Sequence, residues 1–256
     1  MKIINYFNIV VWYLSNFRYI PNLFFLINNK IREIIFSEHR KSFNLKNLKF
    51  SSHNSFFKKE GIKSLDFKKK KIYLDSLKKN KKIIKNFGGE ADLNLLYSVC
   101  NKFISKKTFI LETGVALGWS SLVFLFFLSK RNGFLFSIDM PYVKKNNFNY
   151  VGSAVPNSLK DKWHLYKLPD FQGLKKIIKK NTKFDLIHYD SDKSYYGRKR
   201  SYEILWSVLK KGGYFISDDI SDNLAFLNFV KKKDLIEKKD FYILRYKKKY
   251  IGVVKK

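Results

Sequence analysis

The segment 109–121, FILETGVALGWSS, decides the fold predicted for this chain. Its apolar beginning, residues 109–111, ends in the carboxylate Glu112, and a turn bounded by Gly114 and Gly118 follows. Ser120 and Ser121 then open an apolar run. This order predicts a strand, a tight turn and a helix.

The turn also carries chemical information. Glycines let a backbone approach a ligand, and the start of a helix presents free N–H groups, so nucleotide-type ligands bind at such turns. The pattern here is E-x-G-x-x-x-G, unlike the G-x-G-x-x-G of dinucleotide-binding folds. Glu112 would repel a pyrophosphate but suits a cofactor that carries an ammonium and a sulfonium, such as S-adenosylmethionine. An ordinary turn with a solvated glutamate is the alternative.

Length and composition indicate a globular protein. A chain of 256 residues with 45% hydrophobic residues can bury a full core, which favours one ordinary domain plus an extension. The single cysteine, Cys100, excludes an intramolecular disulfide and fits a reducing compartment, so we expect a cytoplasmic protein.

The net charge of +31 favours polyanionic partners. The excess is mostly lysine, accompanied by many Asn, Ile and Phe, a bias that AT-rich coding also produces. No zinc-finger, RRM or helix-turn-helix pattern accompanies the charge, so we expect no specific nucleic-acid partner, only weak and salt-sensitive adhesion.

Residues 1–35 are rich in aromatic and aliphatic side chains. Arg18 and Pro21 divide them into pieces shorter than the ~20 apolar residues that a spanning helix needs. No signal-peptide pattern is present. Two short helices are therefore expected. They could pack on the body of the protein, on a second subunit or in a membrane interface. Peripheral contact with the inner membrane and a homo-oligomer thus both stay open.

After the opening turn, strands and helices alternate at spacings typical of a parallel sheet covered on both faces. The last two apolar runs are joined by only three lysines, 247–249, which is too short for a crossover helix and predicts an antiparallel hairpin. Further strands are expected at 134–138, 163–168, 184–189, 214–217, 241–246 and 250–254, and helices at 90–104, 171–180, 195–210 and 223–230. The fold class is therefore α/β: doubly wound, seven-stranded, mostly parallel and Rossmann-like, with a C-terminal antiparallel hairpin and a helical N-terminal extension.

Carboxylates stand at the ends of four predicted strands: Glu112, Asp139, Asp190 and the pair Asp218 and Asp219. The carboxyl ends of parallel strands share one edge of the sheet, so these acids should converge on a single crevice. Asp139 follows Gly114 by 25 residues, close to the offset at which an acid binds ribose hydroxyls in the dinucleotide fold. A solvated loop residue or a helix cap is the alternative for each acid.

At these segments the sequence resembles the class I S-adenosylmethionine-dependent methyltransferases, and within them a bacterial branch often associated with surface-polysaccharide genes. The resemblance covers about residues 88–230. It is carried by ETGVALGWSS (112–121), SIDMPY (137–142), VPNSLKDKWHLY (155–166), FDLIHYDSDKSYYG (184–197) and LKKGGYFISDDISDNLAFLNF (209–229). It implies a methyltransferase domain over residues 88–256, preceded by a basic and aromatic helical extension over residues 1–87.

The resemblance also implies site residues. Asp139 would accept the ribose hydroxyls, Asp170 or Phe171 would lie beside the adenine, and Asp190 would border the place where the methyl group leaves sulfur. The methionine end of the cofactor would be held by Glu112, Gly114 and Gly118, with Ser120 beside them.

Lys193 departs from the family pattern, because relatives commonly carry histidine there as a general base. Lysine is a poorer base unless burial lowers its pKa, and the neighbouring acids Asp190 and Asp192 tend to raise it. Methyltransferases of the catechol type, however, combine a lysine with metal-binding acids. This chain has a similar arrangement in Asp190, Lys193, Asp218 and Asp219, and the resemblance implies a Mg²⁺ ion held by the three aspartates. The alternative role for Asp218 and Asp219 is capping of the next helix.

The sequence thus predicts an O-methyltransferase for a sugar or other small hydroxylated metabolite, with Asp190 and Lys193 as the catalytic pair. The alternative is a catalytically inactive methyltransferase fold that serves as a scaffold for nucleic acid or an anionic membrane. Lys193 and the lysine-rich residues 30–87 favour this second hypothesis.

Overall fold

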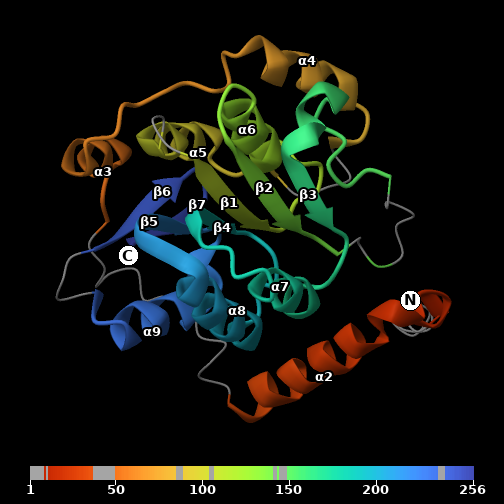
Figure 1. Ribbon diagram of the computed structural model, residues 1–256. Coiled ribbons are helices and arrows are strands. Elements are labelled where there is room, and N and C mark those ends of the chain that lie inside the picture. The colour runs from red at the N-terminus through yellow and green to blue at the C-terminus, as the bar shows by residue number, and fades with distance from the viewer. Residues whose placement is uncertain are drawn as a thin grey trace.

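A computed structural model describes residues 9, 11–36, 50–84, 89–103, 107–140, 143, 149–235 and 240–256. It contains one seven-stranded sheet with helices on both faces (Figure 1). The strand order is β3-β2-β1-β4-β5-β7-β6, and every neighbouring pair from β3 to β5 is parallel. β7 lies antiparallel to both β5 and β6. The predicted fold class, including the C-terminal hairpin, is confirmed.

The strands lie close to their expected positions. β5 is longer than predicted, because Gly212 and Gly213 lie within the strand and not in a turn before it. Gly212 has a positive φ of 73° that glycine adopts without strain, so the chain bulges there, and pairing with β4 resumes at Tyr214. The strands are β1 (Thr108–Thr113), β2 (Gly133–Ile138), β3 (Trp163–Tyr166), β4 (Phe184–Tyr189), β5 (Leu209–Ser217), β6 (Phe241–Tyr246) and β7 (Lys249–Lys255).

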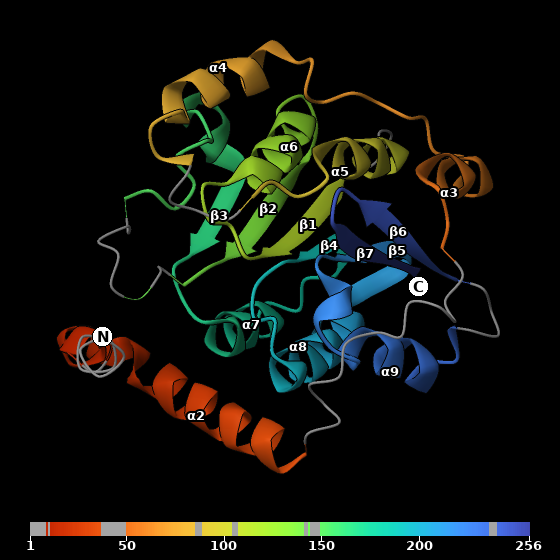
Figure 2. The ribbon, with the colours of Figure 1, turned by 180° about the vertical axis from the view of Figure 1, so that it is seen from behind.

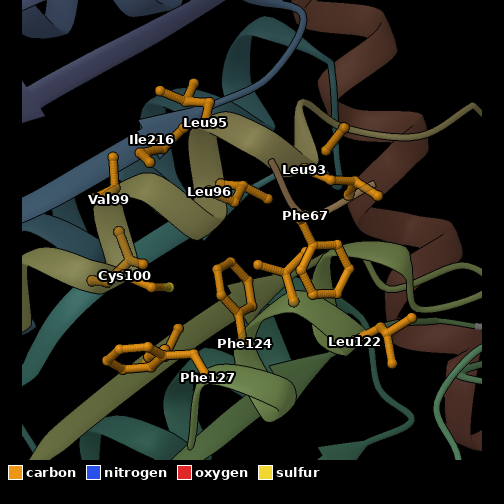
Figure 3. Packing of buried hydrophobic residues seen from close by; sticks show 14 of the residues in the cluster. Phe67, Leu93, Leu95, Leu96, Val99, Cys100, Leu122, Phe124, Phe127 and Ile216 are labelled. Carbon is orange, nitrogen blue, oxygen red and sulfur yellow. The ribbon is translucent and has the colours of Figure 1, made fainter. Parts of the chain in front are cut away.

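Helices cover the two faces of the sheet as separate layers (Figure 1). On one face lie α5 (Leu93–Cys100) and α6 (Trp119–Leu128), and on the other lie α7 (Asp170–Ile178), α8 (Tyr195–Val208) and α9 (Ala225–Lys232). α6 is apolar almost all round and buries every residue except Phe126, because α5 covers the side that faces away from the sheet. Figure 3 shows this packing, with Cys100 as a core thiol among Val99, Phe124 and Phe127.

Residues 50–84 belong to the same core and form no layer of their own. They contain α3 (His53–Glu60) and α4 (Lys71–Asn80), and they bury Phe56, Phe67 and Tyr73 in the cluster that α5 and α6 share. Ser51 also pairs with Leu244 of β6. The expected domain boundary, at residues 87 and 88, lies outside the described residues and stays a prediction, as does the end of the helix predicted to reach Ile104.

The N-terminal segment contains two helical stretches, as expected, although the second is longer than a short helix. Residues 11–15 are helical, and a 16-residue helix, α2 (Ile20–Ile35), follows a short 3₁₀ turn, Phe17–Tyr19. Pro21 lies in the first turn of α2, where a missing N–H costs nothing, so it starts the helix and does not interrupt one. None of the helices among the described residues is long and apolar enough to cross a bilayer.

Glu60, at the end of α3, ties the N-terminal segment to the sheet. Its carboxylate accepts hydrogen bonds from Tyr214 Oη of β5 at 2.7 Å and from Lys255 Nζ of β7 at 2.8 Å, and also from Tyr242 Oη of β6. Burial alone raises the pKa of Glu60, but the three donors outweigh it and lower that pKa below the ordinary 4.5. The ionised carboxylate therefore stabilises the native state.

We expect Glu60→Gln to lower the free energy of unfolding by about 1–3 kcal/mol at pH 7, because an amide cannot satisfy three buried donors. Glu203→Gln is the matched control. Glu203 also accepts from two lysines, Lys232 and Lys233, but on the surface, where such pairs contribute about 0–1 kcal/mol. Urea unfolding of both variants measures the difference, and equal losses would contradict the role assigned to Glu60.

Candidate functional site

A cavity of about 400 Å³ opens at the carboxyl ends of β1, β2 and β4, the edge at which the sequence placed the crevice. Its size is in the range of small-molecule sites. Seven of the predicted site residues line it: Gly114, Ser120, Asp139, Asp170, Phe171, Asp190 and Lys193. The other four lie outside its lining: Glu112, Gly118, Asp218 and Asp219.

The turn after β1 needs its two glycines for different reasons. Gly114 has a φ of 84°, and a Cβ atom there would lie 2.1 Å from the backbone oxygen of Asp190. Only a residue without a side chain lets the turn lie this close to the end of β4. Gly118 has a φ of 89° and forms the N-cap of α6, so it directs the chain into the helix and does not line the cavity.

Glu112 is fully buried behind the cavity wall. Its Oε1 accepts from Ser120 Oγ at 2.5 Å, and its Oε2 accepts from Ser121 Oγ at 2.5 Å and Ser137 Oγ at 2.7 Å. Burial raises the pKa of Glu112 to about 7, more than the three hydroxyl donors lower it. Of these residues only Ser120 lines the cavity, so Glu112 is separated from the cavity by Ser120.

Asp139 joins the end of β2 to the glycine turn. Its Oδ2 accepts from the backbone N–H of Ala116 at 2.7 Å and of Val115 at 3.2 Å. The side chain is partly exposed to the cavity, and the limited contact with water raises its pKa to about 7 despite these donors. A carboxylate fixed by backbone groups at a cavity wall is suited to accept ligand hydroxyls.

Asp170 and Phe171 begin α7 on the opposite wall. The Asp170 carboxylate accepts from Ser191 Oγ of the loop after β4, and burial raises its pKa to about 7. The Phe171 ring contacts Phe25 of α2 at a centroid distance of 5.1 Å. The Arg200 guanidinium lies 5.6 Å from the centroid of Phe171. This wall offers a flat apolar surface with an acid beside it, which fits an aromatic base.

The other end of the cavity is defined by alternating charges. Lys193 Nζ lies 3.2 Å from Asp190 Oδ1 and also contacts Asp219 Oδ2. Lys249 Nζ lies 3.4 Å from Asp219 Oδ2 and 3.9 Å from Asp218 Oδ2. Burial alone lowers the pKa of Lys193, but the two carboxylates raise it above its ordinary value. Lys193 is therefore a cation at neutral pH, which does not favour a role as general base.

Asp218 and Asp219 follow β5 and are braced by a buried arginine. Arg198 of α8 donates to the backbone oxygen of Asp219 at 2.9 Å and lies 3.4 Å from Asp222 Oδ2. Asp219 has a φ of 50°, an unusual conformation for a residue with a side chain. Asp219 is the N-cap residue of the short 3₁₀ helix Ile220–Asp222, although its side chain makes no capping hydrogen bond there. At the start of α9 the backbone N–H of Ala225 donates to Asn223 Oδ1 at 3.1 Å. The capping alternative for Asp218 and Asp219 therefore stays a prediction.

The three aspartates do not fit a Mg²⁺ ion in this arrangement. Ammonium groups contact their carboxylates where a divalent cation would bind, and only Asp190 lines the cavity. Across the part of the chain that the structure describes, no group of three or more His, Cys, Asp or Glu side chains could hold a metal ion.

Two features of the cavity were missed by sequence reasoning. Lys249 reaches it from the start of β7, and its position follows from the hairpin, since an antiparallel strand beside β5 begins at the edge where β5 ends. Residues of α2 form one wall, namely Asn22, Phe25 and Leu26. No local motif marks them, because a segment distant in sequence supplies this wall. Tyr142, the last residue of the segment SIDMPY, lies outside the described residues.

We expect Gly114→Ala to abolish binding of S-adenosylhomocysteine, because its Cβ would push the turn away from the end of β4. Gly212→Ala is the matched control. Gly212 also has a positive φ, but a Cβ atom there meets nothing within 4 Å. Both variants carry backbone strain of about 1 kcal/mol, and only the first carries the clash. Calorimetric titration compares them, and equal affinities would contradict this account of the turn.

The raised pKa of Glu112 predicts a pH dependence of stability. Between its ordinary pKa of 4.5 and its native pKa of about 7, the native state binds more protons than the unfolded state, so the free energy of unfolding falls as pH rises through this window. One such group contributes a slope of at most about 1.4 kcal/mol per pH unit. Urea unfolding at pH 5, 6, 7 and 8 should show a shallower fall in Glu112→Gln than in the unchanged protein. Identical slopes would show that Glu112 is not the group responsible.

Comparisons with known proteins agree with this geometry. Residues 111–220 match the family model described as a methyltransferase domain. A comparison with curated protein sequences finds no match. Among solved structures, the O-methyltransferase from Bacillus cereus in complex with S-adenosylhomocysteine aligns with a TM-score of 0.54 and 16% identity, over 73% of this chain and 92% of that one.

Two further structures have the same fold. TomG, an O-methyltransferase from Streptomyces achromogenes in complex with S-adenosylmethionine, aligns with a TM-score of 0.53 and 12% identity, over 78% of this chain and 94% of that one. CalS11, a TDP-rhamnose 3′-O-methyltransferase, aligns with a TM-score of 0.51 and 13% identity, over 71% and 93%. Residues 111–220 therefore match a methyltransferase domain, and the seven-stranded sheet that carries them has the fold of these O-methyltransferase structures.

Proposed function

We propose that this protein transfers the methyl group of S-adenosylmethionine to a hydroxyl oxygen of a sugar or another small hydroxylated metabolite. The observation that carries the proposal is the division of one cavity into two chemically different ends. The turn of Gly114, the acid Asp139 and the wall of Asp170 and Phe171 suit an adenosyl cofactor. The charged group around Asp190 and Lys193 suits a hydroxyl that must lose its proton.

At the cofactor end each residue has a separate task. Asp139 accepts the ribose hydroxyls while the N–H groups of Val115 and Ala116 hold its carboxylate in place. Phe171 and Asp170, both in the cavity lining, would hold the adenine. Ser120 and the buried charge of Glu112 favour the cationic methionine end. The cofactor supplies a methyl group bound to a positively charged sulfur.

At the acceptor end Asp190 accepts the proton of the hydroxyl. Its pKa is raised by burial, which brings it nearer to the working pH of a base, although Lys193 opposes the shift. The ammonium groups of Lys193 and Lys249 stabilise the negative charge that develops on the acceptor oxygen. These residues would hold the acceptor oxygen toward the methyl group that a bound cofactor would supply, and the electrons of the broken C–S bond would remain on sulfur.

Two observations support the acceptor class. CalS11 is a TDP-rhamnose 3′-O-methyltransferase, and a cavity end with two lysines and an aspartate suits a polar, hydroxylated molecule. The association with surface polysaccharides, a cytoplasmic location and a homo-oligomer stay predictions from the sequence.

Calorimetric titration with S-adenosylhomocysteine tests the cofactor assignment. The unchanged protein should bind, and Asp139→Ala should bind about tenfold or more weakly, since it loses hydrogen bonds to a charged group. Failure of the folded protein to bind, or full affinity in the variant, would contradict the proposal. Binding without turnover on any acceptor would favour the inactive scaffold.

Mass spectrometry of nucleotide sugars and other hydroxylated acceptors, incubated with the cofactor, tests the transfer itself. Lys193→Met should lower kcat by about a hundredfold or more while leaving affinity for S-adenosylhomocysteine nearly unchanged, because its ammonium acts only on the acceptor oxygen. Lys199→Met, on the exposed face of α8, is the control and should keep full activity. Equal activity of the two variants would remove Lys193 from the mechanism.

A further inference from the structure

Helix α2 is amphipathic in the opposite sense to an ordinary surface helix. The residues that it buries against the body are polar, namely Asn22, Asn29 and Glu33, and they lie on one side of the helix at spacings of seven and four. At 100° per residue, the exposed apolar residues of α2 centre on the opposite side. A helix normally turns its apolar stripe toward the core. This one turns it away.

The inward side of α2 is held by specific contacts. Asn22 Nδ2 donates to Tyr13 Oη at 3.3 Å, and Glu33 Oε1 accepts from the backbone N–H of Tyr195, at the start of α8, at 3.1 Å. The Arg32 guanidinium lies 5.5 Å from the centroid of Tyr196. Both views of the fold show α2 lying along the side of the molecule that α7 and α8 form (Figures 1 and 2). The orientation of the helix is therefore fixed by its polar residues.

The outward side is a continuous apolar surface. We refer to the exposed side chains of Phe24, Ile27, Ile31, Ile34 and Ile35, together with Leu14 and Phe17 before the helix, as the outer face. Phe17 and Phe24 are 78% and 67% exposed, and Ile34 and Ile35 are 60% and 66% exposed. Contiguous apolar surfaces of this kind mark sites of interaction with proteins or membranes. The outer face therefore needs a partner.

The charges around the outer face identify the kind of partner. Residues 17–36 contain Arg18, Lys30, Arg32 and Glu33 as charged side chains, and the single acid is the one that is buried. The three cations are exposed, on a chain of net charge +31. A second copy of the chain would bring two strongly positive molecules together, and a nucleic acid would leave the apolar side chains in water. An anionic bilayer satisfies both the apolar residues and the cations.

We propose that the outer face of α2 docks on an anionic lipid bilayer, with the helix lying in the plane of the interface. A helix of 16 residues is about 24 Å long, which suits a helix that lies along the surface and does not cross the membrane. Since Phe25 and Leu26 of the same helix line the cavity, α2 lies between the bilayer and the site. Docking therefore places the methyltransferase site at the membrane surface. This consequence rests on the proposed function, but the docking proposal does not depend on that function.

The test is co-sedimentation of the whole protein with phosphatidylcholine vesicles that contain about 30% phosphatidylglycerol, compared with pure phosphatidylcholine, at physiological salt. We expect binding to the anionic vesicles only. The double variant Ile31→Gln with Ile34→Gln should partition at least about tenfold more weakly, since its side chains no longer enter the interface. The matched control is Leu74→Gln with Ile178→Gln, two exposed apolar residues on α4 and α7, and it should bind like the unchanged protein.

Three results would overturn the proposal. The first is no binding of the unchanged protein to anionic vesicles, and the second is equal binding by the two double variants, which would indicate adhesion that does not use the outer face. The third is a dimer in light scattering that the α2 variant alone dissociates, which would assign the outer face to a second copy. Titration with S-adenosylhomocysteine in the absence of vesicles is independent of the outer face, so failure of docking is distinguishable from failure of the methyltransferase assignment.

Discussion

The site depends on one buried carboxylate, Glu112, and on the three serine hydroxyls that donate to it. These contacts join the end of β1 to the start of α6 and to β2, and Trp163 Nε1 of β3 extends them by donating to Ser137 Oγ at 2.8 Å. The glycine turn therefore starts and ends at fixed points. With the turn in place, Asp139 can accept from its backbone N–H groups, and the cavity wall is complete. Moving Glu112 would disturb the strand, the helix and the cavity together.

Much of this could be read from the sequence, because it follows from local patterns. The segment 109–121 predicts the strand, turn and helix that the structure shows. The acids at strand ends predict the edge of the sheet at which the cavity lies. Glu112 was expected to face a ligand, yet it lies behind Ser120, since a pattern locates a residue at a strand end without telling which way its side chain turns. The wall formed by α2 and the approach of Lys249 depend on contacts between distant segments, and no local pattern reports such contacts.

Charge distinguishes the two ends of the cavity. Asp139 and Asp170 meet no lysine among the hydrogen bonds and ion pairs of the described residues, and both have pKa values raised by burial. At the other end, Lys193 and Lys249 surround Asp190 and Asp219 with positive charge, and the pKa of Asp219 falls below its ordinary value because Lys193 outweighs the effect of burial. One end thus attracts cations, and the other can hold an oxygen that becomes negative. A methyl transfer from a cationic donor to a hydroxyl needs both.

The raised pKa values of Glu112, Asp139 and Asp170 have a consequence for engineering. Each of these acids makes the empty protein less stable at neutral pH than a neutral side chain of the same shape would, because its charge is held away from water. Selection for heat resistance alone would therefore favour substitutions at the very positions that define the cavity. A thermostable variant obtained in that way would keep the fold and lose the site, so any search for sturdier forms of this protein should hold these three positions fixed.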